Sequence, residues 1–312
     1  MPEHPVRRSR RTAIAAVVAS LVLIAAACDP DPPEQLPIGD FGDSLAAYVA
    51  SPNTVAGAND WNCKPSAAHP KPVVLVHGTI ENLGSNWVAL SPMLKNAGYC
   101  VYALNYGMNL FSAGRFGGLA NIADSAQELK AFVNKVTAKS GATKVDIVGH
   151  SQGGMMPNYY IKRLGGAAKV DTLIGLSPSN HGTTLSGVVT LGSSLNLLGF
   201  ANSILVLGTP GLVQQEVGSS FQNALWADGD TVPGVRYVVL QTSHDEVVTP
   251  YANAFLSGPN VTNILVQNQC PDDNVGHIGM FLDSPTLQNV MNQLGPNTPG
   301  FQPVCTGYGM GL

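Results

Sequence analysis

From residue 70 onward, two hydrophobic patterns alternate along the chain. Short continuous apolar runs predict buried strands, and stretches with apolar residues every three or four positions predict amphipathic helices. We expect strands at residues 73–76, 99–105, 145–148, 171–176, 235–241 and 264–267. We expect helices at residues 87–97, 119–136 and 155–164. Apolar strands separated by helices predict an α/β domain with a mostly parallel central sheet and helices on both faces.

Residues 183–230 break this rhythm. They are rich in glycine, serine, leucine and valine and carry almost no charge. An insertion with this apolar composition either packs as an extra layer of the core or forms a cap that lines a cleft for an apolar ligand. The sequence leaves both interpretations open.

The N-terminus has a pattern of its own. Arginines 7, 8, 10 and 11 precede an apolar run over residues 13–27, which ends in small residues before Cys28. This arrangement is typical of a secretory signal peptide at residues 1–27. The run is short for a membrane span, although an uncleaved anchor is the alternative. We expect a proline-rich tether at 28–45 and a single domain at 46–312.

Two finer features concern export. The stretch from Ser9 to Ile14 resembles a twin-arginine signal. Cys28 follows three alanines, so it could carry a lipid anchor or be lost with the signal. In either case we expect a secreted protein.

The charge balance bears on possible partners. The chain has 312 residues and a formal charge of −4, and loss of residues 1–27 removes four arginines and Glu3, which brings the charge to −7. An acidic surface argues against binding to nucleic acid or to a surface that needs a polybasic patch. The expected partner is a small molecule or a lipid, and we expect a monomer.

Four cysteines remain in the exported part. An even number in an exported chain indicates two disulfides, and four cysteines allow three pairings. We favour Cys63–Cys100, because both lie next to predicted neighbouring strands, and Cys270–Cys305, because both lie near the C-terminus. The sequence shows no metal-binding cysteine or histidine spacing, so we expect no metal.

A candidate nucleophile follows the strand at 145–148. The sequence Gly149-His150-Ser151-Gln152-Gly153 has the G-x-S-x-G pattern, and a predicted helix comes directly after it. A serine on so sharp a turn between strand and helix is pushed out above the sheet, and its neighbours must be small. We therefore expect Ser151 to be a catalytic nucleophile rather than part of an ordinary glycine turn.

A serine nucleophile needs a base and an acid that orients the base. With an elbow of this type, the acid and then the histidine follow the serine along the chain. Asp245 comes after the strand at 235–241, at the sheet edge where open α/β sheets place their sites. Its neighbour Glu246 is the best rival.

The candidate base is His277. It follows the predicted last strand on a glycine-flanked loop, and it comes after Asp245 in the chain. The other histidines precede the first strand, belong to tight turns, precede Asp245 or adjoin it; they are His4, His69, His77, His150, His181 and His244.

The candidate oxyanion hole combines two main-chain N–H groups. One belongs to Gln152, the residue after the nucleophile, and the other to Thr79, which follows the strand at 73–76 and the pair His77-Gly78. The Thr79 hydroxyl could add a further hydrogen bond.

These motifs together resemble the class 2 lipase family. The resemblance rests on His77-Gly78, the elbow, the stretch from Ser177 to Thr183, the Asp245 loop and Gly276-His277-Ile278-Gly279, and it covers about residues 60–295. The chain is also similar to the fungal lipase B group, which shares the Ser-Gln-Gly elbow. The resemblance implies an α/β-hydrolase fold and hydrolysis of carboxylic esters without a cofactor. Some related lipases carry structural calcium, and Asp272-Asp273-Asn274 could supply ligands.

The sequence therefore predicts a secreted serine esterase, and more specifically a triacylglycerol lipase with contact to a lipid interface. One alternative is an acyltransferase with the same triad, and another is a binding protein on a hydrolase scaffold. A non-catalytic protein would normally have lost a triad member, whereas this chain has a candidate for each.

Overall fold

The computed structural model describes residues 1–2, 34–184, 186–187 and 209–311. Residues 35–312 group into one compact unit. Residues 3–27 of the predicted signal peptide, Cys28 and much of the apolar insertion predicted at 183–230 lie outside the described residues. No helix within the described ranges is both long enough and apolar enough to cross a membrane.

Six parallel strands form the central sheet in the order β2-β1-β3-β4-β5-β6. Their bounds are Val73–Val76 for β1, Val101–Leu104 for β2, Val145–His150 for β3, Val170–Leu176 for β4, Arg236–Gln241 for β5 and Val261–Leu265 for β6. The first five consist mainly of buried residues, as continuous apolar runs predict.

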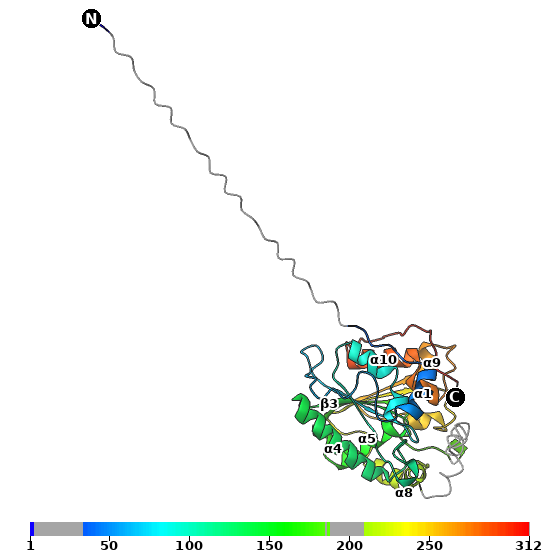
Figure 1. The fold of residues 1–312 in the computed structure, drawn as a ribbon. Coiled ribbons are helices and arrows are strands. Elements are labelled where there is room, and N and C mark those ends of the chain that lie inside the picture. Colours follow the sequence, from blue (N-terminus) through cyan, green and yellow to red (C-terminus); the bar gives the residue numbers. More distant parts are fainter. Residues whose placement is uncertain (3–33, 185, 188–208, 312) are drawn as a thin grey trace. The chain divides into compact units, whose positions relative to one another are not determined.

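Helices cover both faces of this sheet (Figure 1). One face packs against α4 (Ile122–Ser140), α5 (Gln152–Arg163) and α8 (Ser220–Trp226). The other face packs against α3 (Leu90–Asn96) and α10 (Ser284–Leu294). Short helices complete the domain: α2 (Leu83–Asn86), η1 (Leu110–Ser112), η2 (Gly166–Ala168), α7 (Pro210–Val213), η4 (Tyr251–Ala254), α9 (Val266–Gln269) and η5 (Ile278–Phe281).

The last predicted strand needs a correction. Residues 264–267 were expected to form a buried strand, but β6 ends at Leu265 and α9 begins at Val266. The side chains of β6 are half-buried or exposed because β6 is an edge strand, with β5 as its one neighbour. A short apolar run does not by itself distinguish a strand from a helix.

The expected tether at 28–45 is also too long at its C-terminal end. Helix α1 spans Phe41–Ala50, so it begins inside that stretch. Asp40 caps it: its side chain accepts from the N–H of Asp43, whose carboxylate accepts from the N–H of Asp40. This reciprocal pair satisfies two N–H groups at the helix start.

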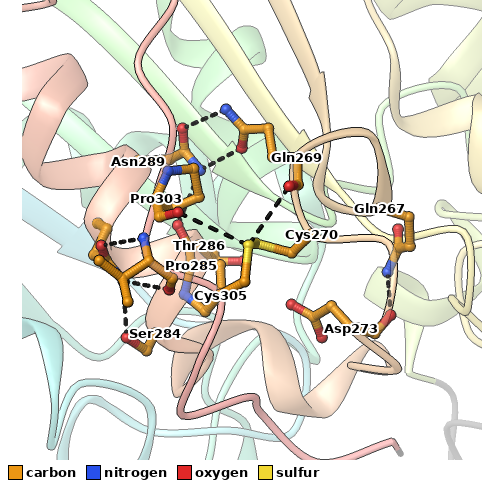
Figure 2. The surroundings of a disulfide bond; sticks show 12 residues. Gln267, Gln269, Cys270, Asp273, Ser284, Pro285, Thr286, Asn289, Pro303 and Cys305 are labelled. Atoms are coloured by element: carbon orange, nitrogen blue, oxygen red, sulfur yellow. Dashed lines mark hydrogen bonds between the residues drawn. A yellow bond between two sulfur atoms is a disulfide. The ribbon is translucent and has the colours of Figure 1, made fainter.

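Two disulfides join the predicted cysteines. Cys63 pairs with Cys100, and Cys270 pairs with Cys305. The first lies at the start of β2, and the second ties the C-terminal segment to the loop after α9. Figure 2 shows the second disulfide beside the mutual side-chain hydrogen bonds of Gln269 and Asn289. This is the pairing that the sequence predicts.

The insertion predicted at 183–230 is not a cap throughout. In its described C-terminal part, α8 contributes Leu225 to the core cluster beside α5. Leu212 of α7 instead joins a separate cluster with Ile80, Leu119 and Val247. The described C-terminal part of the insertion therefore contributes both to the core and to a smaller apolar cluster.

Candidate active site

Ser151 lies in the turn between β3 and α5. Its backbone has φ 53° and ψ −123°, a left-handed conformation that costs a non-glycine residue free energy. A Cβ at Gly149 would collide with the main chain of Gly153, and a Cβ at Gly153 would collide with that of Val76. The two glycines are thus required by close main-chain packing, as the G-x-S-x-G pattern predicts.

Asp245 and His277 come together at the same edge of the sheet. Nδ1 of His277 lies 3.0 Å from Oδ2 of Asp245, and both side chains are buried. The other carboxylate oxygen accepts the N–H groups of Val247 (2.9 Å) and Val248 (2.7 Å). Because the carboxylate is so held, Nδ1 of His277 carries the proton and Nε2 is left as the basic nitrogen.

Glu246 contacts the main chain of the histidine rather than its ring. Its Oε2 accepts from the N–H of His277 at 3.4 Å. The geometry therefore favours Asp245 over Glu246 as the residue that orients the ring.

The pKa of His277 is raised above its ordinary value. Burial lowers this pKa, but the charge of Asp245, the hydrogen bond to it and the charges of Glu246 and Glu81 together outweigh burial. Nε2 is buried and has no hydrogen-bond partner among the described residues. An imidazole in this setting binds a proton readily once one is offered.

The loop after β1 and the start of α5 meet at Thr79 and Gln152. Oγ1 of Thr79 accepts from Nε2 of Gln152 at 3.1 Å and from Nε2 of Gln215 at 3.0 Å. With both lone pairs occupied, the Thr79 hydroxyl proton is available to a third group. The N–H of Gln152 is among the first amides of α5, which find no partner within the helix.

The sequence did not indicate three residues of this site. Gln215 follows the low-charge stretch and has no local pattern to mark it. Glu81 and His150 form a buried pair with Nδ1 of His150 3.0 Å from Oε2 of Glu81. A carboxylate two residues after Thr79, in an otherwise uncharged turn, was the available signal for Glu81.

Metal binding finds no geometric support within the described part of the chain. Among those residues, no group of three or more His, Cys, Asp or Glu side chains could hold a metal ion. Asp273 lies buried, and one of its oxygens accepts from the N–H of Val275 at 2.9 Å. Burial and the neighbouring Asp283 raise its pKa to about 6.

Solved structures of similar fold include two lipases. Lipase B of Aspergillus fumigatus aligns with a TM-score of 0.55 and 22% identity, over 86% of this chain and 61% of that one. The mature lipase BlEst2 of Bacillus licheniformis aligns with a TM-score of 0.52 and 18% identity, over 74% of this chain and 94% of that one. These matches confirm the α/β-hydrolase fold.

Curated relatives match over shorter stretches. A triacylglycerol lipase of Burkholderia plantarii is 35% identical over 123 residues, which is 38% of this chain and 31% of the relative. A triacylglycerol lipase of Pseudarthrobacter phenanthrenivorans is 35% identical over 98 residues, 30% of this chain and 28% of the relative. The matched part thus spans about a third of each relative.

The profile of the family described as "Lipase (class 2)" matches residues 70–288. That range includes both sides of the elbow, the loop with Thr79, and the loops with Asp245 and His277. The chain belongs to the class 2 lipase family.

Proposed function

We propose that this protein is a secreted serine hydrolase of carboxylic esters and acts as a triacylglycerol lipase. The observation that carries the proposal is the buried His277–Asp245 pair, at 3.0 Å, on the sheet edge where the strained Ser151 turn also lies. The signal-like N-terminus and the two disulfides support export. A lipid anchor at Cys28 is compatible with this location.

In the proposed reaction, each of these groups has one role. Ser151 Oγ attacks the ester carbonyl carbon, and Nε2 of His277 takes the hydroxyl proton. The N–H groups of Thr79 and Gln152 bind the resulting oxyanion, and the Thr79 hydroxyl donates a further hydrogen bond. His277 then protonates the departing alkoxide. Water, deprotonated by the same nitrogen, releases the carboxylic acid and restores Ser151.

An apolar cluster beside the oxyanion loop supports a lipid substrate. It joins Tyr48 of α1, Phe116, Leu212 of α7 and Ile80, with Ile278 packed against it. Ile80 follows Thr79 and Ile278 follows His277, so the cluster begins next to the reacting groups. Apolar surface there would favour acyl chains, since each buried methylene contributes about 0.8 kcal/mol at most.

Three segments of this cluster also bear exposed apolar side chains. Val49 on α1 is 55% exposed, Leu110 before Phe116 is 94% exposed, and Val213 on α7 is 58% exposed. The same segments contribute Tyr48, Phe116 and Leu212 to the cluster. Large apolar residues gathered around a site suit contact with a lipid interface.

The decisive assay measures hydrolysis of p-nitrophenyl esters of increasing chain length, below and above substrate aggregation. A lipase gains activity with chain length and on aggregated substrate, and Ser151→Ala abolishes all of it. A rate confined to short soluble esters would leave an esterase. Activity that survives in Ser151→Ala would overturn the proposal.

The interface contact has a separate test. The double variant Val49→Ser and Leu110→Ser should lose activity on emulsified triglyceride while it keeps its rate on a monomeric butyrate ester. Val304→Ser is the matched control, because Val304 is 64% exposed and lies in the C-terminal segment outside this cluster. Equal losses on both substrates would contradict the interface contact.

A further inference from the structure

Two buried titratable side chains take no part in the reaction described above. Glu81 belongs to the loop after β1 and is 8% exposed, and His150 is the last residue of β3 and is 1% exposed. Neither is required by the elbow or by the triad. Together they contact the loop after β1 and the loop with His277, and His150 leads directly into the Ser151 turn.

The ring of His150 bridges two of these loops. Its Nδ1 lies 3.0 Å from Oε2 of Glu81, and its Nε2 lies 3.1 Å from the main-chain oxygen of His277. The rings of His150 and His277 stand 4.9 Å apart between centroids. The histidine before the nucleophile therefore holds the main chain of the candidate base.

Glu81 extends the connection to the oxyanion loop. Its Oε2 accepts the N–H of Gly78 at 2.7 Å, one residue before Thr79. A Cβ on Gly78 would lie 2.6 Å from this oxygen and 3.0 Å from Nδ1 of His150, so glycine is needed for this approach. One carboxylate oxygen thus fixes both the His150 ring and the turn that presents Thr79.

The hydrogen bonds of the pair show which atoms donate and which accept. A carbonyl oxygen only accepts, so Nε2 of His150 must carry a proton to bond to His277. Oε2 of Glu81 already accepts from Gly78, which favours a carboxylate there. Burial raises the pKa of Glu81, but the charge of His150 and its hydrogen bond outweigh burial and leave that pKa lowered. Nδ1 of His150 faces this carboxylate at 3.0 Å.

We propose that Glu81 and His150 form a hydrogen-bonded carboxylate–histidine pair that positions the catalytic base and the oxyanion loop relative to the nucleophile. Both are positioning residues, since they act through the carbonyl of His277 and the N–H of Gly78. The inference rests on the proposed serine hydrolase activity. It adds a second histidine–carboxylate pair beside Asp245–His277, with a structural rather than a proton-transfer role.

Other titratable groups surround both pairs. Glu81 faces His77, Tyr48 and Tyr106 as well as His150, and burial together with Glu81 raises the pKa of both tyrosines. His277 faces Asp245, Glu246 and Glu81. Burial lowers the pKa of His77 to about 4, so this residue is neutral under ordinary assay conditions.

The test compares Glu81→Gln, His150→Phe and the double variant on a soluble short-chain ester. We expect each single variant to lower kcat by about 10- to 100-fold, because small displacements of reacting groups cost about that much. KM should change by less than about threefold, because neither residue touches the substrate. The double variant should be no worse than the poorer single variant, since it leaves no buried charge unpaired.

Asp230→Asn is the matched control. It removes the carboxylate from another histidine–carboxylate pair, His181 with Asp230 at 3.4 Å, outside the site. It should leave kcat and KM unchanged. Wild-type kcat in both Glu81→Gln and His150→Phe would overturn the proposal.

The pH profile of kcat/KM separates positioning from general damage. His150→Phe keeps the Glu81 carboxylate, whose charge raises the pKa of His277 and so keeps the acid limb at higher pH. Glu81→Gln removes that charge. The acid limb of His150→Phe should therefore lie above that of Glu81→Gln, and coincident limbs would contradict a Glu81 carboxylate that acts on the base.

A measurement on the wild-type protein tests the pair even if the variants fail to fold. In ¹⁵N-labelled protein, Nε2 of His150 should carry a proton and donate it to the carbonyl of His277, and an unprotonated Nε2 would overturn the pair. A phosphonate ester that labels Ser151 reports the proposed function independently. If Ser151→Ala abolishes labelling but Glu81→Gln labels at the wild-type rate, this inference alone is contradicted. If Ser151 of the wild-type protein is not labelled, the hydrolase proposal is contradicted.

Discussion

At the amino end of the sheet, charged side chains pair between strands, whereas the carboxyl end contains strained turns and the His277–Asp245 pair. Lys71, before β1, binds Asp171 of β4 and lies 3.5 Å from Asp146 of β3. Lys144 lies 3.7 Å from the same Asp171. At the carboxyl end, by contrast, Ser151 has a positive φ in the turn after β3.

The strain at the carboxyl end recurs in three neighbouring connections. Ile80 after β1 has φ 63°, Ser151 after β3 has φ 53° and Ser177 after β4 has φ 43°. Left-handed backbone costs a non-glycine residue about 1–3 kcal/mol, and such strain gathers at functional sites. The comparison indicates that the amino end of the sheet stabilises the fold. The carboxyl end instead has strained turns at the site, which lower the free energy of unfolding. The predictions below test this division.

The largest expected effect follows from removal of the nucleophile. Ser151→Ala and Ser151→Gly should each lower kcat by on the order of 10⁴- to 10⁶-fold, with loss of His277 as well adding little. Glycine relieves the positive φ and alanine does not, so Ser151→Gly should be more stable than Ser151→Ala by about 1 kcal/mol. Urea unfolding of the two variants measures the difference. Equal stability would show that the turn stores no strain.

The next effect separates two adjacent carboxylates. Asp245→Asn should lower kcat by on the order of 10²- to 10⁴-fold, because an amide no longer fixes the tautomer of His277. Glu246→Gln is the matched control, and it should lower kcat by less than about threefold, because Glu246 contacts the main chain alone. Steady-state kinetics on one soluble ester decides between them. The reverse order would make Glu246 the orienting acid.

Activity should also depend on the protonation of His277. The base acts only when neutral, and its pKa is raised because Asp245, Glu246 and Glu81 together outweigh burial. The acid limb of kcat/KM should therefore lie above the ordinary histidine pKa of about 6.5, with activity falling tenfold per pH unit below it. A rate profile from pH 5 to 9 tests this. An acid limb below pH 6 would be incompatible with the three carboxylates acting on this ring.

The two disulfides close loops of similar length, so their removal compares the amino and carboxyl ends of the sheet. They close sequence separations of 37 and 35 residues. Each should therefore contribute about 3–4 kcal/mol by the chain-entropy estimate. Replacing Cys63 and Cys100 by serine should lower the melting temperature alone. Replacing Cys270 and Cys305 should also lower kcat, because the latter pair braces the segment that leads to His277.

A contact of the C-terminal segment supports this difference. The N–H of Gly276, next to His277, donates to the carbonyl of Met310 at 2.8 Å. Cys305 anchors that segment a few residues earlier. An equal loss of kcat in both disulfide variants, measured well below their melting temperatures, would argue against a separate role for Cys270–Cys305.

Local rules explain why much of the site could be predicted from the sequence. β1 occupies the predicted residues, and the elbow follows from glycines that the main chain requires on both sides of Ser151. The acid and the base were chosen by chain order and strand ends, and the structure places Asp245 and His277 together. These features depend on neighbours within a few residues or on the direction of parallel strands.

The parts that could not be predicted depend on contacts between distant segments. Gln215 reaches Thr79 across 136 positions of sequence, and His150 reaches the carbonyl of His277 across 127. No sequence spacing predicts either contact. By contrast, the start of α1 had a local signal in Asp40 and Asp43 that the proline-rich composition around it obscured.

The smallest effect concerns the amino end alone. Burial raises the pKa of Asp171, but the hydrogen bond to Lys71 and the charges of Lys71, Lys144 and Arg236 outweigh it and leave that pKa lowered. A carboxylate with a lowered pKa in the folded state stabilises the protein above its unfolded pKa of about 3.9, and that contribution disappears as the pH falls through the folded value. Because the side chain is 38% exposed, solvent screens the charges and Asp171→Asn should cost less than about 1 kcal/mol at pH 7. The unfolding free energies of variant and wild type should therefore differ at pH 7, and the difference should shrink as the pH is lowered below about 3.9, with kcat unchanged. A loss of kcat in this variant would mean that the two ends of the sheet are coupled, and the division drawn above would fail.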